Sequence, residues 1–208
     1  MRAAGSLWSL GAGPGSWTYA LFDALRGGVN RGLARYLLGA LDGVTAPRTL
    51  EAGSGPGFCS TLLAARRSGL RAVRLDQDGV ALAAGGASRA AAVRGDLYRL
   101  PFADATFDLV FNSSTMEHLD DFGGALGEMA RVTRAGGRIF VGVPYRYGVF
   151  LPFTLVPAGH PVSVWMGRLY SRRALLAACR RAGLRALRTR WYFMAGFVGV
   201  LLAREGGR

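Results

Sequence analysis

The sequence contains no lysine, and all 26 of its basic residues are arginine. Cysteine and histidine are also scarce, with two residues of each kind. Cys59 and Cys179 stand far apart, without a Cys-x-x-Cys spacing or a histidine cluster beside them. This pattern indicates neither a disulfide framework nor a zinc site. We therefore expect two buried thiols and no bound metal.

No long hydrophobic run is present either. The longest apolar run near the C-terminus covers residues 191–203 and is interrupted by glycine. It falls short of the roughly 20 residues that cross a bilayer. The first residues carry one arginine and a weakly apolar stretch broken by glycine, which is a poor match to a signal peptide. We expect a soluble, cytoplasmic protein, and peripheral contact with a membrane stays open.

Negative charge is missing from one part of the chain. Residues 1–128 hold 12 arginines and 12 acidic residues, whereas residues 129–208 hold 14 arginines and only Glu205. The net charge of +13 therefore comes entirely from the second part. Codon bias is the simpler explanation of any single arginine, but a field of one sign favours anionic partners. A membrane surface, a nucleic acid and a small acidic substrate all remain open.

The length of 208 residues suits one α/β domain, and half of the residues are apolar, so a packed core is expected. Short apolar stretches alternate with helical spacing, which favours a doubly wound parallel sheet covered on both faces. The expected strands are residues 49–52, 70–75, 92–94, 107–112, 138–143, 184–193 and 197–204. The last two are joined by a tight turn, which predicts an antiparallel hairpin. The main expected helices are residues 17–25, 32–41, 123–132 and 172–182.

Acidic residues follow three successive predicted strands. Ligands of such sheets bind at the carboxyl ends of the strands, so Glu51, Asp76 and Asp96 together predict a nucleoside pocket. Asp76 is placed to accept hydrogen bonds from ribose hydroxyls. Asp96 is placed to accept one from an adenine amino group, with the Leu97 N–H facing a ring nitrogen. A role as helix N-cap fits Asp78 better than Asp76, and a Gly-Asp pair such as the one at Asp96 also occurs in ordinary turns.

A glycine loop stands between the first two of these acids. Residues 51–57 read EAGSGPG, which places glycines at Gly53, Gly55 and Gly57. Glycine allows positive φ and lets a ligand approach the main chain at the start of the next helix. The spacing is Gly-x-Gly-x-Gly, unlike the Gly-x-Gly-x-x-Gly of dinucleotide-binding folds. A purely structural turn would use the same residues.

A further run, LPFADATFDLV at residues 100–110, joins these motifs. Together they resemble the class I S-adenosylmethionine-dependent methyltransferases, particularly the small-molecule branch similar to ubiquinone and menaquinone methyltransferases. The resemblance runs from about residue 49 to 143. It implies S-adenosyl-L-methionine as cofactor and a Rossmann-like sheet of seven strands ordered 3-2-1-4-5-7-6, with strand 7 antiparallel. It also implies that Asn112 and Ser113 line the methionine part of the cofactor and that Gln77 lies beside its ribose and adenine.

The resemblance implies a single methyltransferase domain. We expect residues 1–47 to form an N-terminal helical cap and residues 48–143 to form the cofactor-binding core. We expect residues 144–170 to form a lid on the substrate side and residues 171–208 to supply the final helix and the closing hairpin. Aromatic residues gather in the cap and the lid and predict a small, apolar or aromatic acceptor, methylated by in-line displacement. They are Trp17, Tyr19, Phe22, Tyr145, Tyr147, Phe150, Phe153 and Trp165.

A general base is needed only where the acceptor loses a proton, and His118 and His160 are the two histidine candidates. A structural role is open for both: His118 starts a helical turn beside the predicted pocket, and His160 lies in the irregular lid. Some ubiquinone-type O-methyltransferases bind a metal through a Glu-His pair with a further Glu three residues earlier. Here Glu117 precedes His118 but the third position is Ser114, so we predict no metal.

Nucleic acid is disfavoured as the methyl acceptor. Residues 112–115 read NSST, without the Asn/Asp-Pro-Pro-aromatic run of enzymes that methylate base amino groups, and no cysteine stands near this point. A nicotinamide-dependent oxidoreductase is disfavoured by the glycine spacing and by the absence of a Tyr-x-x-x-Lys pair. The remaining alternative is a non-catalytic or weakly catalytic adaptor that docks to membrane or RNA through the basic C-terminal half. The acceptor, the methylated atom and the oligomeric state stay open.

Overall fold

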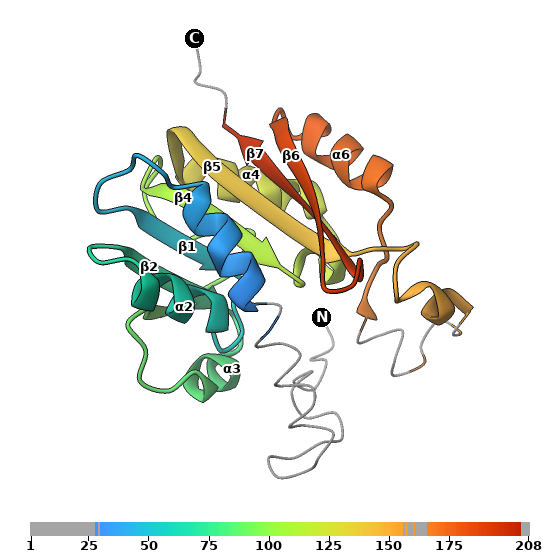
Figure 1. The fold of residues 1–208 in the computed structure, drawn as a ribbon, viewed down its shortest axis with the longest axis horizontal. Coiled ribbons are helices and arrows are strands. Elements are labelled where there is room, and N and C mark those ends of the chain that lie inside the picture. The colour runs from blue at the N-terminus through green and yellow to red at the C-terminus, as the bar shows by residue number, and fades with distance from the viewer. Residues whose placement is uncertain (1–27, 29, 156, 158–159, 161–165, 205–208) are drawn as a thin grey trace.

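The computed structural model describes residues 28, 30–155, 157, 160 and 166–204. Its centre is a seven-stranded sheet with the order β3-β2-β1-β4-β5-β7-β6 (Figure 1). The strands are β1 (Arg48–Ala52), β2 (Arg71–Asp76), β3 (Ala91–Arg94), β4 (Phe107–Ser113), β5 (Thr133–Pro144), β6 (Arg185–Tyr192) and β7 (Phe197–Ala203). β1 to β5 pair in parallel, and β7 runs antiparallel to both β5 and β6. The predicted strand order and the closing hairpin are confirmed.

Helices cover both faces of the sheet (Figure 1). They are a helix of residues 30–39, α2 (Phe58–Arg66), α3 (Gly79–Ala84), α4 (Phe122–Val132) and α6 (Arg172–Arg181), with short 3-10 turns at η2 (Met116–His118) and η3 (Leu151–Leu155). The helix of residues 30–39 and α2 pack on one face, where the core includes Leu33, Leu37, Cys59, Leu63, Phe111 and Phe140. α4 and α6 pack on the other face, where the core includes Val110, Leu126, Met129, Ile139, Leu175 and Cys179.

Local sequence explains why these elements begin where they do. The first six residues of β4 are all buried, as expected for a central parallel strand covered on both faces. Three helices begin at a residue whose side chain caps backbone N–H groups: Asp78 for α3, Asp121 for α4 and Ser171 for α6. Both cysteines are buried free thiols, as predicted.

The strand order reverses at β1: the chain continues from β1 to β2 on one side, and β4 lies on the other side of β1. Ligands of such sheets bind at the carboxyl ends of the strands beside this point, so we expect the cofactor crevice there. Within the described ranges, none of the helices combines the length and the hydropathy that a membrane crossing needs. No group of three or more metal-ligating side chains occurs in that same part of the chain.

The start of β5 differs from the prediction. Residues 133–137 read TRAGG, which suggests a turn, and we expected the strand to begin at residue 138. The structure begins it at Thr133, which pairs with Phe107 before the register shifts at a bulge. The predicted strand was therefore five residues short. The helix expected over residues 17–25 lies outside the described residues.

Candidate functional site

The glycine loop wraps around the carboxyl end of β2. Gly53, Gly55 and Gly57 all have positive φ, at 75°, 52° and 73°. The N–H of Gly53 donates to the carbonyl of Leu75 at 2.8 Å, and the N–H of Gly55 donates to Oδ2 of Asp76 at 2.7 Å. Hydrogen bonds from the glycine loop to the end of β2 therefore hold the loop and Asp76 together.

Two of these glycines have no room for a side chain. A Cβ on Gly53 would lie 2.6 Å from Cγ2 of Thr115, whose hydroxyl donates to the carbonyl of Gly53. A Cβ on Gly57 would lie 2.5 Å from Cδ of Arg74. Both positions also hold a backbone conformation that L side chains rarely adopt. The loop is therefore fixed in a shape that only glycine permits.

Asp76 is held in place by two backbone groups. One carboxylate oxygen accepts from Gly55, and the other accepts from the N–H of Asp78 at 2.9 Å. Because each carboxylate oxygen has two acceptor positions, both keep capacity for a further donor such as a hydroxyl. Asp78, in contrast, uses its own side chain to cap α3. The exposed Gln77 accepts through its backbone carbonyl from Nε of Arg94 at 3.1 Å.

Glu51, the first predicted acid, is buried and faces α2. Its Oε2 accepts from both the backbone N–H and the hydroxyl of Ser60, at 2.9 and 2.6 Å. Burial raises the pKa of this carboxyl to about 7, although the hydrogen bonds from Ser60 and the charge of Arg74 act in the opposite direction. The charge of Asp76 raises the pKa of Glu51 further.

The third acid lies beside the same strand end. The N–H of Gly95 donates to the carbonyl of Asp76 at 3.0 Å, which brings the end of β3 against the end of β2. Asp96 is exposed and its Oδ1 accepts from the N–H of Tyr98 at 2.9 Å, while Leu97 is buried. Asp96 therefore has one carboxylate oxygen engaged in its own turn, and its predicted contact with adenine stays a prediction.

Asn112 and Ser113 connect the carboxyl end of β4 to its neighbours. The amide of Asn112 is fully buried and donates to the carbonyl of Ala52, and its Oδ1 accepts from the N–H of Met116 at 3.3 Å. The hydroxyl of Ser113 lies 2.9 Å from the phenol oxygen of Tyr192. Both predicted residues therefore stand at the crevice, and both have structural hydrogen bonds there.

Sequence reasoning missed Arg74, which lies in β2 beneath the glycine loop. Its side chain is buried, and its guanidinium donates to the carbonyls of Pro56 at 2.8 Å, Leu82 at 2.9 Å and Gly86 at 3.2 Å. These bonds join the loop to the end of α3. An arginine in an alternating strand gives no sequence signal for such a role, because its partners are backbone carbonyls.

Glu117 is a second buried carboxyl that the sequence did not indicate as such. The hydroxyl of Ser114 donates to its Oε1 at 2.8 Å, and among the described residues no group hydrogen-bonds its Oε2. Burial raises the pKa of Glu117 to about 8. The chain near Gly167 lies against Glu117: the N–H of Arg168 donates to its backbone carbonyl at 3.2 Å, and a Cβ on Gly167 would lie 2.8 Å from its Cγ.

Of the two histidines, His118 belongs to the crevice by position. It ends η2, directly after β4, and a Cβ on Gly167 would lie 2.9 Å from its Nδ1. Partial burial lowers the pKa of His118 below its ordinary value. His160 is exposed, and its backbone N–H donates to the carbonyl of Pro157 at 3.2 Å. Its immediate neighbours lie outside the described residues.

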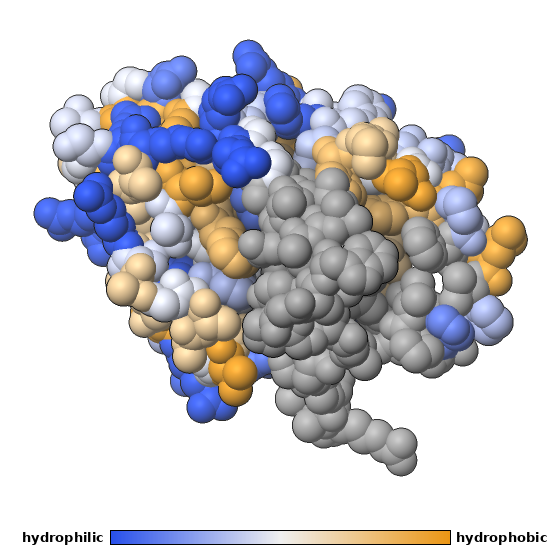
Figure 2. Space-filling model, turned by 60° about the horizontal axis from the view of Figure 1, so that its bottom comes forward, coloured by the Kyte–Doolittle hydropathy of each residue, from blue (hydrophilic) through white to orange (hydrophobic). Residues whose placement is uncertain are grey.

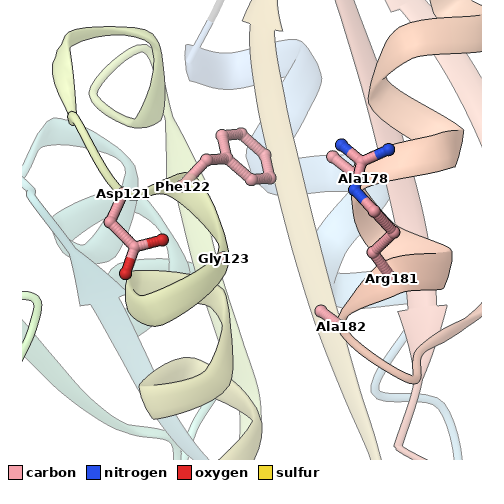
Figure 3. A pocket seen from close by; sticks show the side chains of 6 residues that line it. All are labelled: Asp121, Phe122, Gly123, Ala178, Arg181 and Ala182. Carbon is pink, nitrogen blue, oxygen red and sulfur yellow. The ribbon is translucent and has the colours of Figure 1, made fainter.

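A separate hollow of about 400 Å³ lies between α4 and α6. Figure 3 shows the two helices on either side of it, with Phe122 on one and Arg181 on the other. It is lined by Asp121, Phe122, Gly123, Ala178, Arg181 and Ala182. No residue of the glycine loop or of the strand ends takes part in it, so we assign it no role in the site.

Comparison with known proteins agrees with this geometry. A family described as a methyltransferase domain matches residues 50–141. A demethylmenaquinone methyltransferase from Beutenbergia cavernae is 36% identical over 152 residues, covering 68% of this chain and 62% of that protein. Over these residues the chain is similar to the class I S-adenosylmethionine-dependent methyltransferases. The cofactor of this class is S-adenosyl-L-methionine, and the residues around the loop match its needs: a hydroxyl acceptor at Asp76 and a main chain without side chains at Gly53 and Gly57.

Two further similarities concern the sequence and the fold, respectively. A demethylmenaquinone methyltransferase from Mycobacterium marinum is 43% identical over 94 residues, or 45% of this chain and 40% of that protein. The solved 1,6-didemethyltoxoflavin-N1-methyltransferase of Burkholderia thailandensis, bound to its substrate and S-adenosylhomocysteine, has a TM-score of 0.66 at 18% identity, covering 86% of this chain and 79% of that one. This chain spans about 40% of the length of the first curated relatives that it matches.

Proposed function

We propose that this chain transfers the methyl group of S-adenosylmethionine to a small acceptor with an apolar, aromatic or quinoid part. The observation that carries the proposal is the bond between Gly55 and Asp76, which fixes a carboxylate against a main-chain cradle. A carboxylate there is suited to hold both ribose hydroxyls, and the cradle is suited to the methionine part. When bound, the cofactor supplies an electrophilic methyl group on its sulfonium, open to in-line displacement by the acceptor.

The acceptor side is proposed from the segment that follows β5. Residues 144–146 lie beside Tyr170, because the N–H of Arg146 donates to the carbonyl of Tyr170 at 3.0 Å and the N–H of Tyr170 donates to that of Pro144 at 3.0 Å. This brings Tyr145 and Tyr170 together at the carboxyl edge of the sheet. Two aromatic side chains at this edge support a ring-bearing acceptor as our proposal, in line with the demethylmenaquinone methyltransferases among the relatives.

Where the acceptor must lose a proton, we propose His118 as the group that takes it. It follows β4, whose carboxyl end carries Asn112 and Ser113, the residues predicted to line the methionine part of the cofactor. Its lowered pKa keeps the ring neutral near pH 7, which is the state that accepts a proton. His118→Gln should lower the transfer rate without changing cofactor affinity. His160 stays a second candidate, tested by the same pair of measurements on His160→Gln.

Calorimetric titration with S-adenosylhomocysteine tests the cofactor site. Each charge-assisted hydrogen bond to Asp76 is worth roughly 1.5–3 kcal/mol, so Asp76→Ala should weaken binding at least tenfold. Asp42→Ala is the matched control, because Asp42 is exposed and precedes β1 at the opposite edge of the sheet. Unchanged affinity in Asp76→Ala would contradict the proposed ribose contact.

Transfer of a labelled methyl group tests the activity itself. We expect labelled product from a reduced naphthoquinone probe and none from an oligonucleotide. The adaptor alternative predicts cofactor binding with no labelled product from any small acceptor. These two outcomes are separable, because binding and transfer are measured independently.

A further inference from the structure

Large apolar side chains are exposed at the carboxyl edge of the sheet, next to the closing hairpin. The most exposed are Leu155 at 86%, Met194 at 74% and Tyr147 at 61%. We call the full set the apolar rim; it consists of Tyr147, Val149, Leu151, Leu155, Trp191 and Met194. Figure 2 shows hydrophobic residues along the right of the face that it draws, and others on its left. Exposed apolar groups of this size mark interaction surfaces when they are contiguous.

The two segments that carry the rim pack against each other. Gly148 lies so close to the carbonyl of Ala195 that a Cβ at Gly148 has no room. The ring of Tyr145 contacts those of Tyr147 and Trp191, with centroid distances of 5.8 and 6.3 Å. Residues 145–150 and the closing hairpin therefore lie side by side, and Leu151 and Leu155 follow in η3.

A layer of packed aromatic side chains lies beneath this surface. Phe150 is buried and contacts the rings of Phe193 and Phe197 at 6.4 and 5.4 Å. Phe197 in turn stacks on the buried ring of Tyr192 at 5.3 Å. The rim residues next to Phe150 and the hairpin are thus carried on packed rings.

The segments that carry the rim contribute charge of one sign. Residues 129–204 contain no acidic residue, and the exposed Arg146 directly precedes Tyr147. Arg190 in β6 is exposed too, and its guanidinium lies over the ring of Tyr36, 4.9 Å from the centroid. The rim segments therefore combine apolar side chains with arginine and carry no carboxylate of their own, which is the composition of a surface that meets an anionic, partly apolar partner.

We propose that the apolar rim docks this chain onto an anionic lipid bilayer. Aliphatic side chains such as Leu155 and Met194 would enter the headgroup boundary, the rings of Tyr147 and Trp191 would lie at the interface, and the arginines would meet lipid phosphates. RNA fits less well, because aliphatic side chains offer no stacking surface to bases. A second copy fits less well, because two surfaces of the same sign repel each other.

The apolar rim lies at the same edge of the sheet as the glycine loop, which suggests a function for the docking. β5 ends and β7 begins at the carboxyl edge, where Pro144 pairs with Phe197, and the glycine loop lies at the same edge. A docked molecule would turn this edge toward the lipid, so an apolar acceptor would reach the methyl site without crossing water. This last step rests on the proposed function, whereas docking itself does not.

Co-sedimentation of the full chain with vesicles tests the proposal without cofactor or acceptor. We expect binding to vesicles of 70% phosphatidylcholine and 30% phosphatidylglycerol, and at least tenfold weaker binding to phosphatidylcholine alone. Raising NaCl from about 0.05 to 0.5 M should weaken the binding several-fold, because salt screens the arginine contribution. Absence of binding to the anionic vesicles would overturn the proposal.

Matched variants then locate the surface. Met194→Asp and Leu155→Asp should each weaken vesicle binding about tenfold, since each removes one inserted apolar side chain. Both side chains are mostly exposed, and Met194 has a φ of 48°, which aspartate tolerates. Val80→Asp is the control for them, because Val80 is 72% exposed on α3. Equal binding by Val80→Asp and the rim variants would overturn the assignment of this surface.

A charge reversal provides a second pair. Arg146→Glu should weaken vesicle binding, whereas Arg89→Glu, an exposed position before β3, should not. Titration of every variant with S-adenosylhomocysteine separates the docking proposal from the proposed function. Vesicle binding can be lost while cofactor affinity is unchanged, and cofactor affinity can be lost while vesicle binding is unchanged. Two other outcomes would assign the surface to another partner and overturn the proposal. One is a dimer, seen by light scattering, that Met194→Asp dissociates. The other is RNA binding that the rim variants lose, with no binding of the chain to vesicles.

Discussion

The hydroxyl of Ser113 and the phenol of Tyr192 lie 2.9 Å apart and join the carboxyl ends of β4 and β6, which are 79 residues apart in the chain. Burial raises the pKa of Tyr192, so the phenol stays protonated and able to share this bond. The bond fixes the edge of the predicted cofactor crevice against the closing hairpin.

Tyr192→Phe should therefore lower the free energy of unfolding by about 1 kcal/mol, the typical net contribution of one hydrogen bond. Urea unfolding measures the change. Tyr147→Phe removes the same hydroxyl from an exposed ring and should change the stability by less than about 0.5 kcal/mol. Equal effects of the two substitutions would show that the bond to Ser113 contributes nothing.

Gly57→Ala should destabilise the fold and weaken cofactor binding, because the new Cβ meets Cδ of Arg74 at 2.5 Å in addition to the strain of positive φ. Gly43→Ala separates the two causes, since Gly43 has a similar φ of 80° and open space around it. We expect about 1–2 kcal/mol of strain in both variants. Only Gly57→Ala should show an additional loss of stability, together with at least tenfold weaker binding of S-adenosylhomocysteine.

Most of the sheet could be predicted from local sequence. The apolar stretches at β1, β2 and β4 were located to within about one residue, because buried parallel strands need continuous apolar side chains. Asp78 was predicted to cap α3, and the structure confirms it. The same apolar pattern predicted where these strands end. The sequence therefore predicted correctly that Asp76 and the glycine loop lie together.

What the sequence did not predict depends on contacts between distant segments. Arg74 bonds to three backbone carbonyls, and carbonyls have no sequence signature. Glu51 was predicted to line the pocket, and its burial against Ser60 depends on how α2 packs on β1. Glu117 is buried because the chain near Gly167 returns over it, which local spacing does not indicate.

Asn112→Asp should be among the most destabilising single changes in the chain. The side-chain amide of Asn112 is fully buried and donates to the carbonyl of Ala52, so a carboxylate there would face an acceptor without water. We expect a loss of about 3 kcal/mol or more at pH 8, as for other uncompensated buried charges. At pH 5 the loss should be smaller, because a protonated carboxyl can donate again. Thermal unfolding at both pH values measures the difference, and a loss that does not depend on pH would contradict this account.

The buried carboxyls predict how stability depends on pH. The pKa of Glu117 is about 8 and that of Glu51 about 7 in the folded chain, against ordinary values near 4.5. The folded state thus holds protons that the unfolded state has released, so stability is fully present below about pH 4.5 and declines as pH rises toward 8. Each carboxyl contributes a slope of at most about 1.4 kcal/mol per pH unit between its two pKa values.

Urea unfolding of wild type, Glu117→Gln and Glu128→Gln at pH 5, 6, 7 and 8 checks this dependence. Glu117→Gln removes one titrating group and should flatten the decline. Glu128 differs, because the hydrogen bond from Arg131 lowers its pKa and its contribution is already complete at pH 5. Glu128→Gln should therefore shift the whole curve downward without changing its slope. If Glu117→Gln kept the slope of wild type, the burial of that carboxyl would have no energetic consequence, and its unpaired oxygen would have to be solvated in the folded chain.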